Sequence, residues 1–369
     1  DRMKKIFIIS NSGWNIYNFR LLLINKLSKK CNLIISSPSD DFSKRFNDLK
    51  LKFIPINYSR NSISLLSNLT IIIKYFLIFI KEKPDIILLY TIKPNIFVSI
   101  AAILTLRKIK LYNFITGIGN LYFSKKLKKN FIFFLYKLSL FKSKKIIFQN
   151  LDDLNYFVSN NIVKENRCKL VPGSGVNSKH FIFSDLPNTP NYELKFLCIS
   201  RIIEHKGILE YIQAAKKIKK EYPNIIFKLV GSIDKEYPAV FKKENLENLS
   251  KYIKLIDFSE NIIDLIKECD CFVLPSYREG TSRSILEAAS IGRPIITSDV
   301  PGCNNIVKDN FNGFLCKPRD SISLYENIKK MIHTKFNIRK QMAINSRKLI
   351  ENNFDSEIIN NKILNIIDL

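Results

Sequence analysis

Residues 271–299 read CFVLPSYREGTSRSILEAASIGRPIITSD, and this stretch decides the fold of the surrounding chain. Its two ends, CFVLPS (271–276) and PIITSD (294–299), are short apolar runs bounded by turn-forming residues, which is typical of buried strands. The segment between them begins with small hydroxyl residues and continues as an apolar helix. A strand–helix–strand unit of this kind favours parallel strands with the helix as the crossover.

The same alternation recurs along both halves of the chain. It predicts an α/β fold with two Rossmann-like, doubly wound parallel-sheet domains facing a central cleft. The polar, proline-rich stretch 183–194 is a plausible linker, so we expect domains at 1–185 and 186–345 and a C-terminal helix at 346–369 that docks back on the first domain. The other predicted strands are 5–10, 32–37, 85–90, 110–116, 145–150, 195–200, 225–231 and 252–257.

Charge is distributed unequally over the 369 residues, whose formal net charge is +26. Residues 1–180 hold 31 Lys and Arg against nine Asp and Glu, and no acidic residue lies between Asp85 and Asp152. Within that gap, residues 122–145 interleave eight lysines with aromatic and aliphatic residues. This basic amphipathic pattern favours an anionic membrane surface. A nucleic-acid patch and a merely solvated face are the alternatives. The predicted membrane contacts are Lys125, Lys126, Lys128 and Lys129.

Other composition features narrow the class of protein. The seven cysteines are scattered, and no Cys/His cluster suggests a metal site, so we expect a reduced, cytoplasmic chain. The most apolar segment, residues 70–80, is shorter than the roughly 20 residues that a spanning helix needs and contains Lys74. We therefore expect a buried or interfacial helix there and membrane contact from one side only.

Two cations follow the strand at 195–200. Arg201 and Lys206 precede Gly207 and a helix, and ligands of open α/β sheets bind beyond the carboxyl ends of the strands. An arginine fork and a lysine point charge at one strand end suit a diphosphate. Taken alone, they could equally be solvated surface cations. Gly231 ends the next strand.

Two carboxylates flank the helix start after the strand at 271–276. Glu279 and Glu287 could accept hydrogen bonds from the vicinal hydroxyls of sugars, since ionised carboxylates are strong acceptors. Alternatively, Ser284 and Glu287 form a capping box, and Glu279 is a solvated loop charge. Together with Arg201 and Lys206, the carboxylates predict a nucleotide-sugar site.

The strand ends of the first half carry weaker signals. Gly13 permits a tight turn and close backbone approach to a ligand phosphate, although a simple turn explains it too. Thr91 and Lys93 could reach a polar ligand or be ordinary surface residues. Gly117 and Gly119 mark a place where the backbone comes near another group.

In these motifs the chain resembles the retaining glycosyltransferases of family four, which have the GT-B fold. Arg201 and Lys206 match the family's R…KG motif, and EGTSRSILE (279–287) matches its E-x7-E motif. YTIKPN (90–95) and ITGIGN (115–120) resemble a bacterial branch that builds polyprenyl-diphosphate-linked oligosaccharides. SGWNIYNFR (12–20) is similar to the start of the α-1,3-N-acetylgalactosaminyltransferases of N-glycan and O-antigen assembly.

The resemblance implies a role for each matching residue. Arg201 and Lys206 would stabilise the donor diphosphate, Glu279 would contact the transferred sugar, and Glu287 would hold the ribose. The donor would also be lined by Gly231, by the backbone at Gly280, Thr281 and Ser282, and by Gly13, which would approach the phosphates or the acceptor.

Many relatives have a histidine where this chain has Thr116 and Gly117. The three histidines, His180, His205 and His333, are not placed for that role in the sequence, so the resemblance implies front-face attack with the leaving phosphate taking the acceptor proton. No cofactor or metal is expected, because Arg201 and Lys206 neutralise the leaving group.

The expected function is therefore transfer of a sugar, preferably GalNAc, from a UDP-sugar to an undecaprenyl-diphosphate-linked saccharide, by a peripheral enzyme at the cytoplasmic face of the inner membrane. UDP-galactose and UDP-GlcNAc are the alternative donors, for O-antigen or capsule. An epimerase or phosphorylase on the same fold is a rival enzyme, and a basic membrane- or nucleic-acid-binding protein is the non-enzymatic one. No motif for nucleic acid is present, so no nucleic-acid partner is expected.

Overall fold

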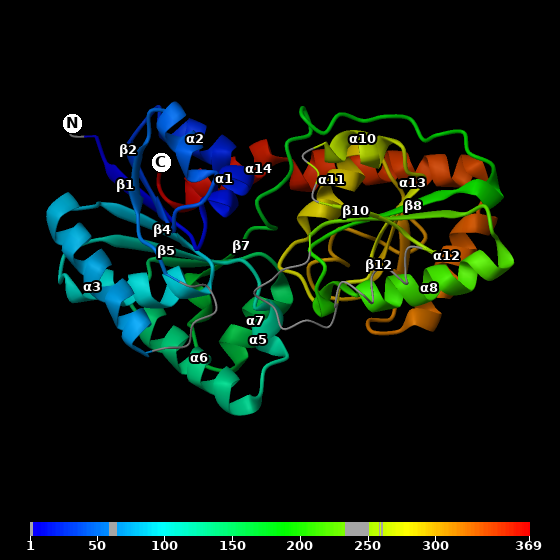
Figure 1. Ribbon diagram of the computed structural model, residues 1–369. Coiled ribbons are helices and arrows are strands. Elements are labelled where there is room, and N and C mark those ends of the chain that lie inside the picture. The colour runs from blue at the N-terminus through cyan, green and yellow to red at the C-terminus, as the bar shows by residue number, and fades with distance from the viewer. Residues whose placement is uncertain (1–2, 59–64, 233–250, 258, 260) are drawn as a thin grey trace. The chain divides into compact units, whose positions relative to one another are not determined.

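The computed structural model describes residues 3–58, 65–232, 251–257, 259 and 261–369, and these form two compact units (Figure 1). The first comprises 1–174 with 359–369, and the second comprises 175–358. The division precedes the proline-rich stretch 183–194, which belongs to the second unit. There Phe181 is part of the buried core, and the Ser184 N–H donates to the Ile291 carbonyl over 3.0 Å.

The first unit is built on a seven-stranded sheet whose order is β3-β2-β1-β4-β5-β6-β7, with every pairing parallel. The side chains of a strand alternate between its two faces. Ile6 and Ile8 accordingly pack on one side of the sheet, while Phe7 and Ile9 pack on the other. The strands are β1 (Lys5–Ile9), β2 (Asn32–Ser37), β3 (Lys52–Pro55), β4 (Ile86–Tyr90), β5 (Lys110–Ile115), β6 (Lys145–Phe148) and β7 (Cys168–Leu170).

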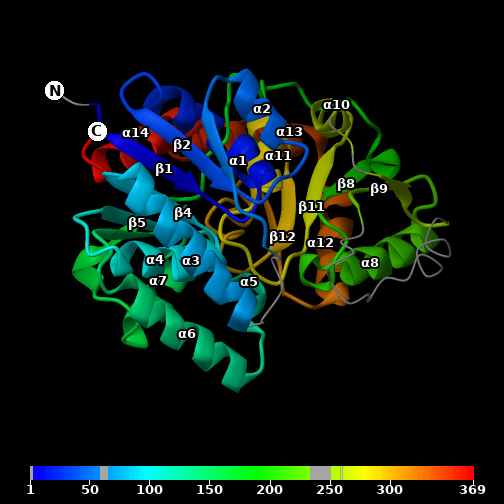
Figure 2. The same cartoon turned by 60° about the vertical axis from the view of Figure 1, so that its left-hand side comes forward.

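Helices cover both faces of this sheet. One face carries α1 (Gly13–Leu27), α2 (Ser43–Asp48) and α14 (Ser356–Ile366), which packs through Ile359, Ile363 and Leu364. The other face carries α3 (Leu65–Glu82), the π-helical turn η1 (Pro94–Val98), α4 (Ser99–Leu104), α6 (Lys126–Leu140) and α7 (Leu151–Ser159), as Figure 2 shows. The short elements α5 (Gly119–Tyr122) and η2 (Glu165–Arg167) complete the unit.

The second unit has a six-stranded parallel sheet whose order is β10-β9-β8-β11-β12-β13. Its strands are β8 (Lys195–Ile199), β9 (Ile226–Val230), β10 (Lys254–Ile256), β11 (Cys271–Leu274), β12 (Ile295–Ser298) and β13 (Gly313–Cys316). Helices α8 (Ile208–Glu221) and α12 (Ser321–His333) pack on one another. The opposite face carries α10 (Ile262–Lys267), α11 (Arg283–Ile291) and α13 (Phe336–Leu349) (Figure 1). The turns η3 (Asn191–Glu193), η4 (Glu204–Lys206) and η5 (Ile350–Phe354) join them.

The predicted fold class is confirmed in both units, since each is a parallel sheet with helices on both faces. Alternation of short apolar runs with amphipathic segments was sufficient to predict it. The seven cysteines are all unpaired and buried. Among the described residues, no helix is long and apolar enough to cross a bilayer.

Candidate active site

The strongest predicted residues lie on two adjacent loops of the second unit. β8 and β11 are hydrogen-bonded neighbours, so the loops that follow them leave the same edge of the sheet side by side. The Tyr277 N–H donates to the His205 carbonyl over 2.9 Å and joins the two loops. Lys206, from the first loop, forms an ion pair with Glu279, from the second. The structure thus brings together two predicted catalytic residues.

The carboxylate of Glu279 has a second partner. The Ser276 hydroxyl donates to the same Oε1 over 2.8 Å. The Glu279 and Lys206 side chains are 14% and 19% exposed, so both charges are largely shielded from water but reachable. Ser276 was not among the predicted residues, although it lies at the end of an apolar strand run. Its position at the carboxyl end of a predicted strand, where ligands of such sheets bind, could have identified it.

Gly207 lets the two loops approach closely. Its backbone is left-handed, with φ 68°, and a Cβ there would lie 2.0 Å from the Pro275 carbonyl oxygen. Glycine adopts this conformation without the steric cost that other residues meet. The close contact positions Lys206, the residue immediately before it.

A third loop, which follows β12, holds the backbone on both sides of the Glu279 turn through hydrogen bonds. The Glu279 N–H donates to the Pro301 carbonyl, and the Ser282 N–H donates to the Gly302 carbonyl, each over 3.0 Å. These partners follow β12, which pairs with β11. Residues 279–282, which include the predicted donor residues Gly280 and Thr281, are therefore held by backbone bonds at both ends.

Glu287 lies inside α11 and is buried. Its Oε1 accepts from the Arg283 Nε over 2.7 Å, and Arg283 also donates to the Gly175 carbonyl. Burial raises the pKa of the Glu287 carboxyl by more than Arg283 lowers it. The capping-box interpretation is wrong: Ser282 is the N-cap, with no side-chain cap bond, and Ser284 lies within the helix.

Arg201 and Gly231 lie at the neighbouring ends of β8 and β9. The Ser200 N–H donates to the Val230 carbonyl over 3.0 Å, and a Cβ on Gly231 would meet the Ser200 carbonyl oxygen at 1.9 Å. The Arg201 side chain is exposed, and it lies in the same loop after β8 as Lys206. The carboxyl edge of this sheet thus presents Arg201, Lys206 and Glu279 on adjacent strand ends.

Tyr277, Glu210 and Arg319 form a group of side chains beside this edge that was not predicted. The Tyr277 hydroxyl donates to Glu210 over 2.7 Å, and the Arg319 guanidinium lies 4.6 Å from the Tyr277 ring. Burial and the Glu210 carboxylate raise the pKa of Tyr277. His205 lies in the same loop as Lys206, and burial lowers its pKa.

His180 and His333 occupy other places. His180 is in the second unit near Glu287, whose pKa it helps to lower. His333 ends α12, where its Nε2 lies 2.9 Å from the Tyr222 hydroxyl. Within the described ranges, no group of three or more His, Cys, Asp or Glu side chains could hold a metal ion.

In the first unit, Gly13 begins α1. A Cβ there would meet the Asp40 Oδ1 at 2.4 Å, and the Trp14 N–H donates to the Asp40 Oδ2 over 2.9 Å. The negative group at this helix start is therefore the chain's own carboxylate.

Thr91, Lys93, Thr116 and Gly117 follow β4 and β5, which are paired neighbours. Thr91 is left-handed, with φ 69°, an uncommon conformation for a branched residue. The Lys93 Nζ donates to the Asn68 Oδ1 over 3.1 Å, and burial lowers the pKa of Lys93. The structure brings these four residues to one edge of the sheet, as predicted from the strand ends.

The predicted membrane lysines belong to the start of α6. Lys125 is its N-cap, Lys125, Lys126 and Lys128 are exposed, and Lys129 is half-buried with its Nζ 5.6 Å from the Tyr122 ring. The same helix leaves a row of large apolar side chains exposed, at Leu127, Phe131, Phe134, Leu138 and Phe141.

Comparison with known proteins identifies the family. Residues 183–349 match the model of the glycosyl transferases group 1, and residues 5–150 match the glycosyl transferase 4-like model. The chain is 30% identical to the N,N'-diacetylbacillosaminyl-diphospho-undecaprenol alpha-1,3-N-acetylgalactosaminyltransferase of Campylobacter jejuni, over 99% of this chain and 98% of that protein. It is 27% identical to the UDP-Gal:alpha-D-GlcNAc-diphosphoundecaprenol alpha-1,3-galactosyltransferase of Escherichia coli, over 87% of this chain and 83% of that one.

Solved structures show the same fold. Anabaena HepE in complex with UDP and glucose is 18% identical, with a TM-score of 0.79 and full coverage of both chains. The sucrose-phosphate synthase of Thermosynechococcus elongatus is 17% identical, with a TM-score of 0.82, over 99% of this chain and 98% of that one. Both units thus have the architecture of GT-B glycosyltransferases. The chain belongs to the group 1 glycosyltransferases and is an enzyme of that family.

Proposed function

We propose that this enzyme transfers N-acetylgalactosamine from UDP-GalNAc to an undecaprenyl-diphosphate-linked saccharide, with retention at the anomeric carbon. The observation that carries the proposal is the Lys206–Glu279 pair beside Ser276 at the carboxyl edge of the second sheet. It joins a cation suited to a diphosphate with a carboxylate suited to a sugar. The polyprenyl acceptor and GalNAc are supported by the Campylobacter relative, whose name states both.

Lys206 and Arg201 act on the leaving group in this proposal. An ammonium has three N–H donors, so Lys206 can keep Glu279 as a partner and still donate to a phosphate oxygen. Arg201 is exposed in the same loop after β8 and can offer its fork to the same diphosphate. Both cations stabilise negative charge that grows on UDP as its bond to the sugar breaks.

The two glutamates bind hydroxyl groups. Glu279 accepts from the transferred sugar, held in place by the backbone bonds of residues 279–282. Glu287 accepts from the ribose hydroxyls, and its burial makes an unmatched hydrogen bond there costly. Gly231, Gly280, Thr281 and Ser282 line the donor through their backbone.

Retention follows from front-face attack. The bond from the sugar C1 to the phosphate oxygen breaks, the bond from C1 to the acceptor oxygen forms on the same face, and the acceptor proton passes to the leaving phosphate. Arg201 and Lys206 supply the positive charge that stabilises UDP in this step, so we propose that no metal is required.

The acceptor binds through the first unit. Thr91, Lys93, Thr116 and Gly117 share one edge of its sheet, and Lys93 offers a positive charge there. We propose that α6 holds this unit on the anionic cytoplasmic face of the inner membrane through Lys125, Lys126, Lys128 and Lys129. The exposed apolar row along the same helix supports the proposal, because interfacial helices combine basic and apolar faces.

Galactose is the second candidate for the transferred sugar. The Escherichia coli relative is named as a UDP-galactose-dependent enzyme. UDP-GlcNAc is the third candidate. Membership of the glycosyltransferase family argues against the epimerase and the non-enzymatic binding protein.

A donor screen tests the proposal directly. The purified chain is incubated with a polyprenyl-diphosphate-linked monosaccharide, a chelator and each of a panel of UDP- and GDP-sugars, and the acceptor is weighed by mass spectrometry. Gain of one N-acetylhexosamine with UDP-GalNAc only is the expected result. Gain of a hexose with UDP-galactose would make galactose the transferred sugar in place of GalNAc. If no donor of the panel gives a mass gain while UDP still binds, the proposed acceptor is wrong.

A further inference from the structure

Tyr277 ties the loop after β8 to the loop after β11 at two points. Its backbone N–H donates to the His205 carbonyl over 2.9 Å, and its hydroxyl donates to the Glu210 Oε1 over 2.7 Å. These two acceptors lie one residue before Lys206 and four residues after it in the sequence. From the neighbouring strand end, Tyr277 therefore holds the chain on both sides of Lys206, while Glu279 lies two residues further along its own loop.

The Glu210 carboxylate depends on the Tyr277 hydroxyl. Glu210 lies in the first turn of α8. Its second oxygen, Oε2, is buried, and no residue of the described chain donates a hydrogen bond to it. Loss of the Tyr277 hydroxyl would leave both oxygens without a donor among the described residues, which costs free energy unless the carboxylate turns toward water. Such a turn moves the start of α8, and Lys206 lies two residues before α8 begins.

The Tyr277 side chain is itself held in one place. It is 7% exposed, and the guanidinium carbon of Arg319, from the loop between β13 and α12, lies 4.6 Å from the ring centroid. A cation over the face of an aromatic ring makes an attractive contact. Burial, and then the Glu210 carboxylate, raise the pKa of Tyr277, so the hydroxyl keeps its proton and remains a donor. Arg319 and Glu210 thus fix the ring and the hydroxyl, respectively.

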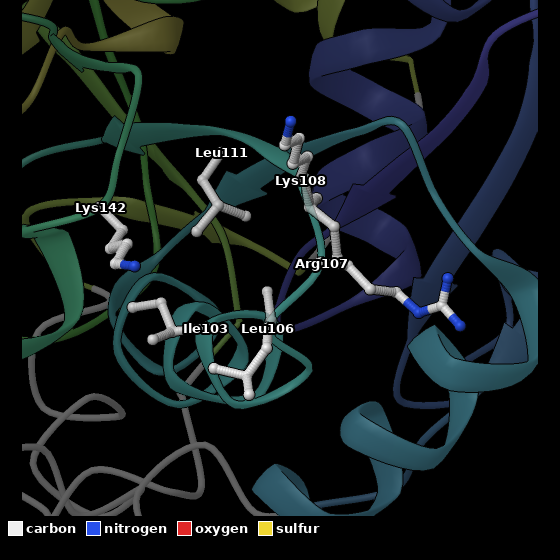
Figure 3. Close-up of a pocket in the computed structure, with 8 residues that line it drawn as sticks. Ile103, Leu106, Arg107, Lys108, Leu111 and Lys142 are labelled. Atoms are coloured by element: carbon white, nitrogen blue, oxygen red, sulfur yellow. The ribbon is translucent and has the colours of Figure 1, made fainter.

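In the pocket of the first unit, by contrast, the cations do not converge. This pocket has a volume of about 310 Å³ and is lined by residues of α4, β5 and the turn between them, together with Lys142. Figure 3 shows the charged ends of Arg107 and Lys108 pointing away from the hollow and from Lys142. Because the three charges point apart, they do not form a site for one anion.

We propose that Tyr277 and Glu210 are positioning residues for the donor diphosphate. Their hydrogen bond fixes the turn before α8 and so keeps the Lys206 ammonium between Glu279 and the phosphate that leaves. The inference rests on the proposed function and deepens its donor site. Tyr277 and Glu210 act through Lys206, because Lys206 is the residue of this turn that pairs with Glu279. A displaced cation stabilises the leaving phosphate less well, and a misplacement of about 1 Å can cost about a hundredfold in rate.

The chain offers a matched pair of variants on one helix. Tyr277→Phe removes the hydroxyl that donates to Glu210, near the start of α8. At the end of the same helix, the Tyr325 hydroxyl donates to Glu221, so Tyr325→Phe removes a bond of the same kind. The two glutamates are separated by about 16 Å along the helix axis, at about 1.5 Å per residue. Glu210→Ala removes the acceptor instead of the donor and is the second test variant.

The Kd values of the full chain for UDP and UMP, measured by calorimetry, test the proposal. Glu279 is assigned to the transferred sugar, which is bonded to the second phosphate, so Lys206 beside it is assigned to that phosphate. UMP lacks this phosphate. Tyr277→Phe and Glu210→Ala should raise the Kd for UDP about fivefold or more and change the Kd for UMP less than about twofold. Tyr325→Phe should change neither. An equal rise for both nucleotides in Tyr277→Phe would overturn the positioning role, because a general loss of structure weakens both.

Combination with Lys206→Ala tests whether Tyr277 acts through Lys206. Lys206→Ala should raise the Kd for UDP about tenfold, and addition of Tyr277→Phe should raise it no further. Additive losses would overturn the proposal. The kcat of Tyr277→Phe should fall about tenfold or more, whereas that of Tyr325→Phe should stay at the wild-type value.

Hydrogen exchange keeps this inference apart from the transferase proposal. Without any ligand, the amides of residues 203–207 should exchange faster in Tyr277→Phe than in the wild-type chain and in Tyr325→Phe. Unchanged exchange in Tyr277→Phe would overturn the positioning role alone, whatever the donor sugar. Transfer from a GDP-sugar in the donor screen would replace UDP in the proposed function, and GDP and GMP would then be the titrated ligands. A wild-type chain that binds none of these nucleotides would overturn the proposed function and the donor role of Tyr277 together.

Discussion

The Lys206 ammonium and the Glu279 carboxylate form an ion pair across 73 residues of sequence. Neither charge is fully solvated, because the two side chains are 19% and 14% exposed. The pair therefore holds a cation and a carboxylate beside one another at the end of adjacent strands. This is the arrangement on which the proposed roles in leaving-group and sugar binding depend.

Glu279→Gln should lower kcat about a hundredfold while leaving the Kd for UDP nearly unchanged. The amide keeps the size of the side chain but loses the charge that strengthens hydrogen bonds to the transferred sugar. Turnover by product mass and UDP affinity by calorimetry check this. Glu268→Gln, which removes an exposed carboxylate paired with Lys228 in the same unit, is the matched control. Near-normal turnover in Glu279→Gln would contradict the assignment to the sugar.

Arg201→Ala should lower kcat and also raise the Kd for UDP. Loss of a charge-assisted hydrogen bond to the diphosphate costs about 1.5–3 kcal/mol, so the Kd for UDP should rise about tenfold or more and kcat should fall as well. The same two measurements check it. Lys220→Ala, an exposed cation on α8, should leave both unchanged. If Arg201→Ala binds UDP like the wild-type chain, Arg201 does not contact the diphosphate.

Gly207→Ala should destabilise the second unit by at least about 2 kcal/mol, because the methyl group would enter the Pro275 carbonyl in a left-handed conformation. UDP affinity should fall in the remaining folded chain, since Lys206 is displaced. Gly119→Ala is the control: it is also left-handed but meets no atom within 4 Å, so only about 1 kcal/mol is expected. The free energy of unfolding in denaturant and the Tm from thermal unfolding are measured for both variants. A loss in Gly207→Ala no larger than in Gly119→Ala would contradict the prediction.

The stability of the chain should depend on the protonation of Glu287. Its pKa is raised above the ordinary 4.5 by burial, so the folded chain binds a proton that the unfolded chain has lost. The contribution of Glu287 is then fully present below about pH 4.5 and is lost as pH rises through the raised pKa. The free energy of unfolding of the wild-type chain, relative to Glu287→Gln, should fall with rising pH in that window.

The contribution of Glu268 to the free energy of unfolding should change with pH in the opposite direction. Its hydrogen bond from Lys228 lowers its pKa, so its contribution is present above the ordinary pKa and lost as pH falls. Unfolding curves at a series of pH values, for wild type, Glu287→Gln and Glu268→Gln, check both slopes. A flat difference for Glu287→Gln would mean that Glu287 ionises normally in the folded chain.

Phe131→Ser with Phe134→Ser should weaken binding to anionic vesicles about a hundredfold or more. Both rings are exposed on α6, and burial of each in the interface is worth about 1.5–3 kcal/mol. Met3→Ser with Leu49→Ser, two exposed apolar residues elsewhere in the first unit, should have no such effect. Binding should also weaken with salt and should not extend to oligonucleotides.

The fold class could be predicted from the sequence, and so could the position of the candidate site residues at the ends of strands. Runs such as 271–276 and 294–299 are apolar throughout because parallel strands are buried on both faces, and this pattern is local. β3, β7 and β13 were not predicted, because they are short and their residues also suit loops. The start of α1 at Gly13 depends on the Ser12 hydroxyl, which accepts from the Asn15 N–H.

The sequence by itself determined which residue types stand at the strand ends: Arg201 and Lys206 after β8, Glu279 after β11, and a strongly basic first half. Only the tertiary structure decided their partners. Lys206 meets Glu279 because β8 and β11 are adjacent, and Glu287 pairs with Arg283 in place of a cap. Strand order and side-chain burial arise from packing over long sequence separations, which no local pattern encodes.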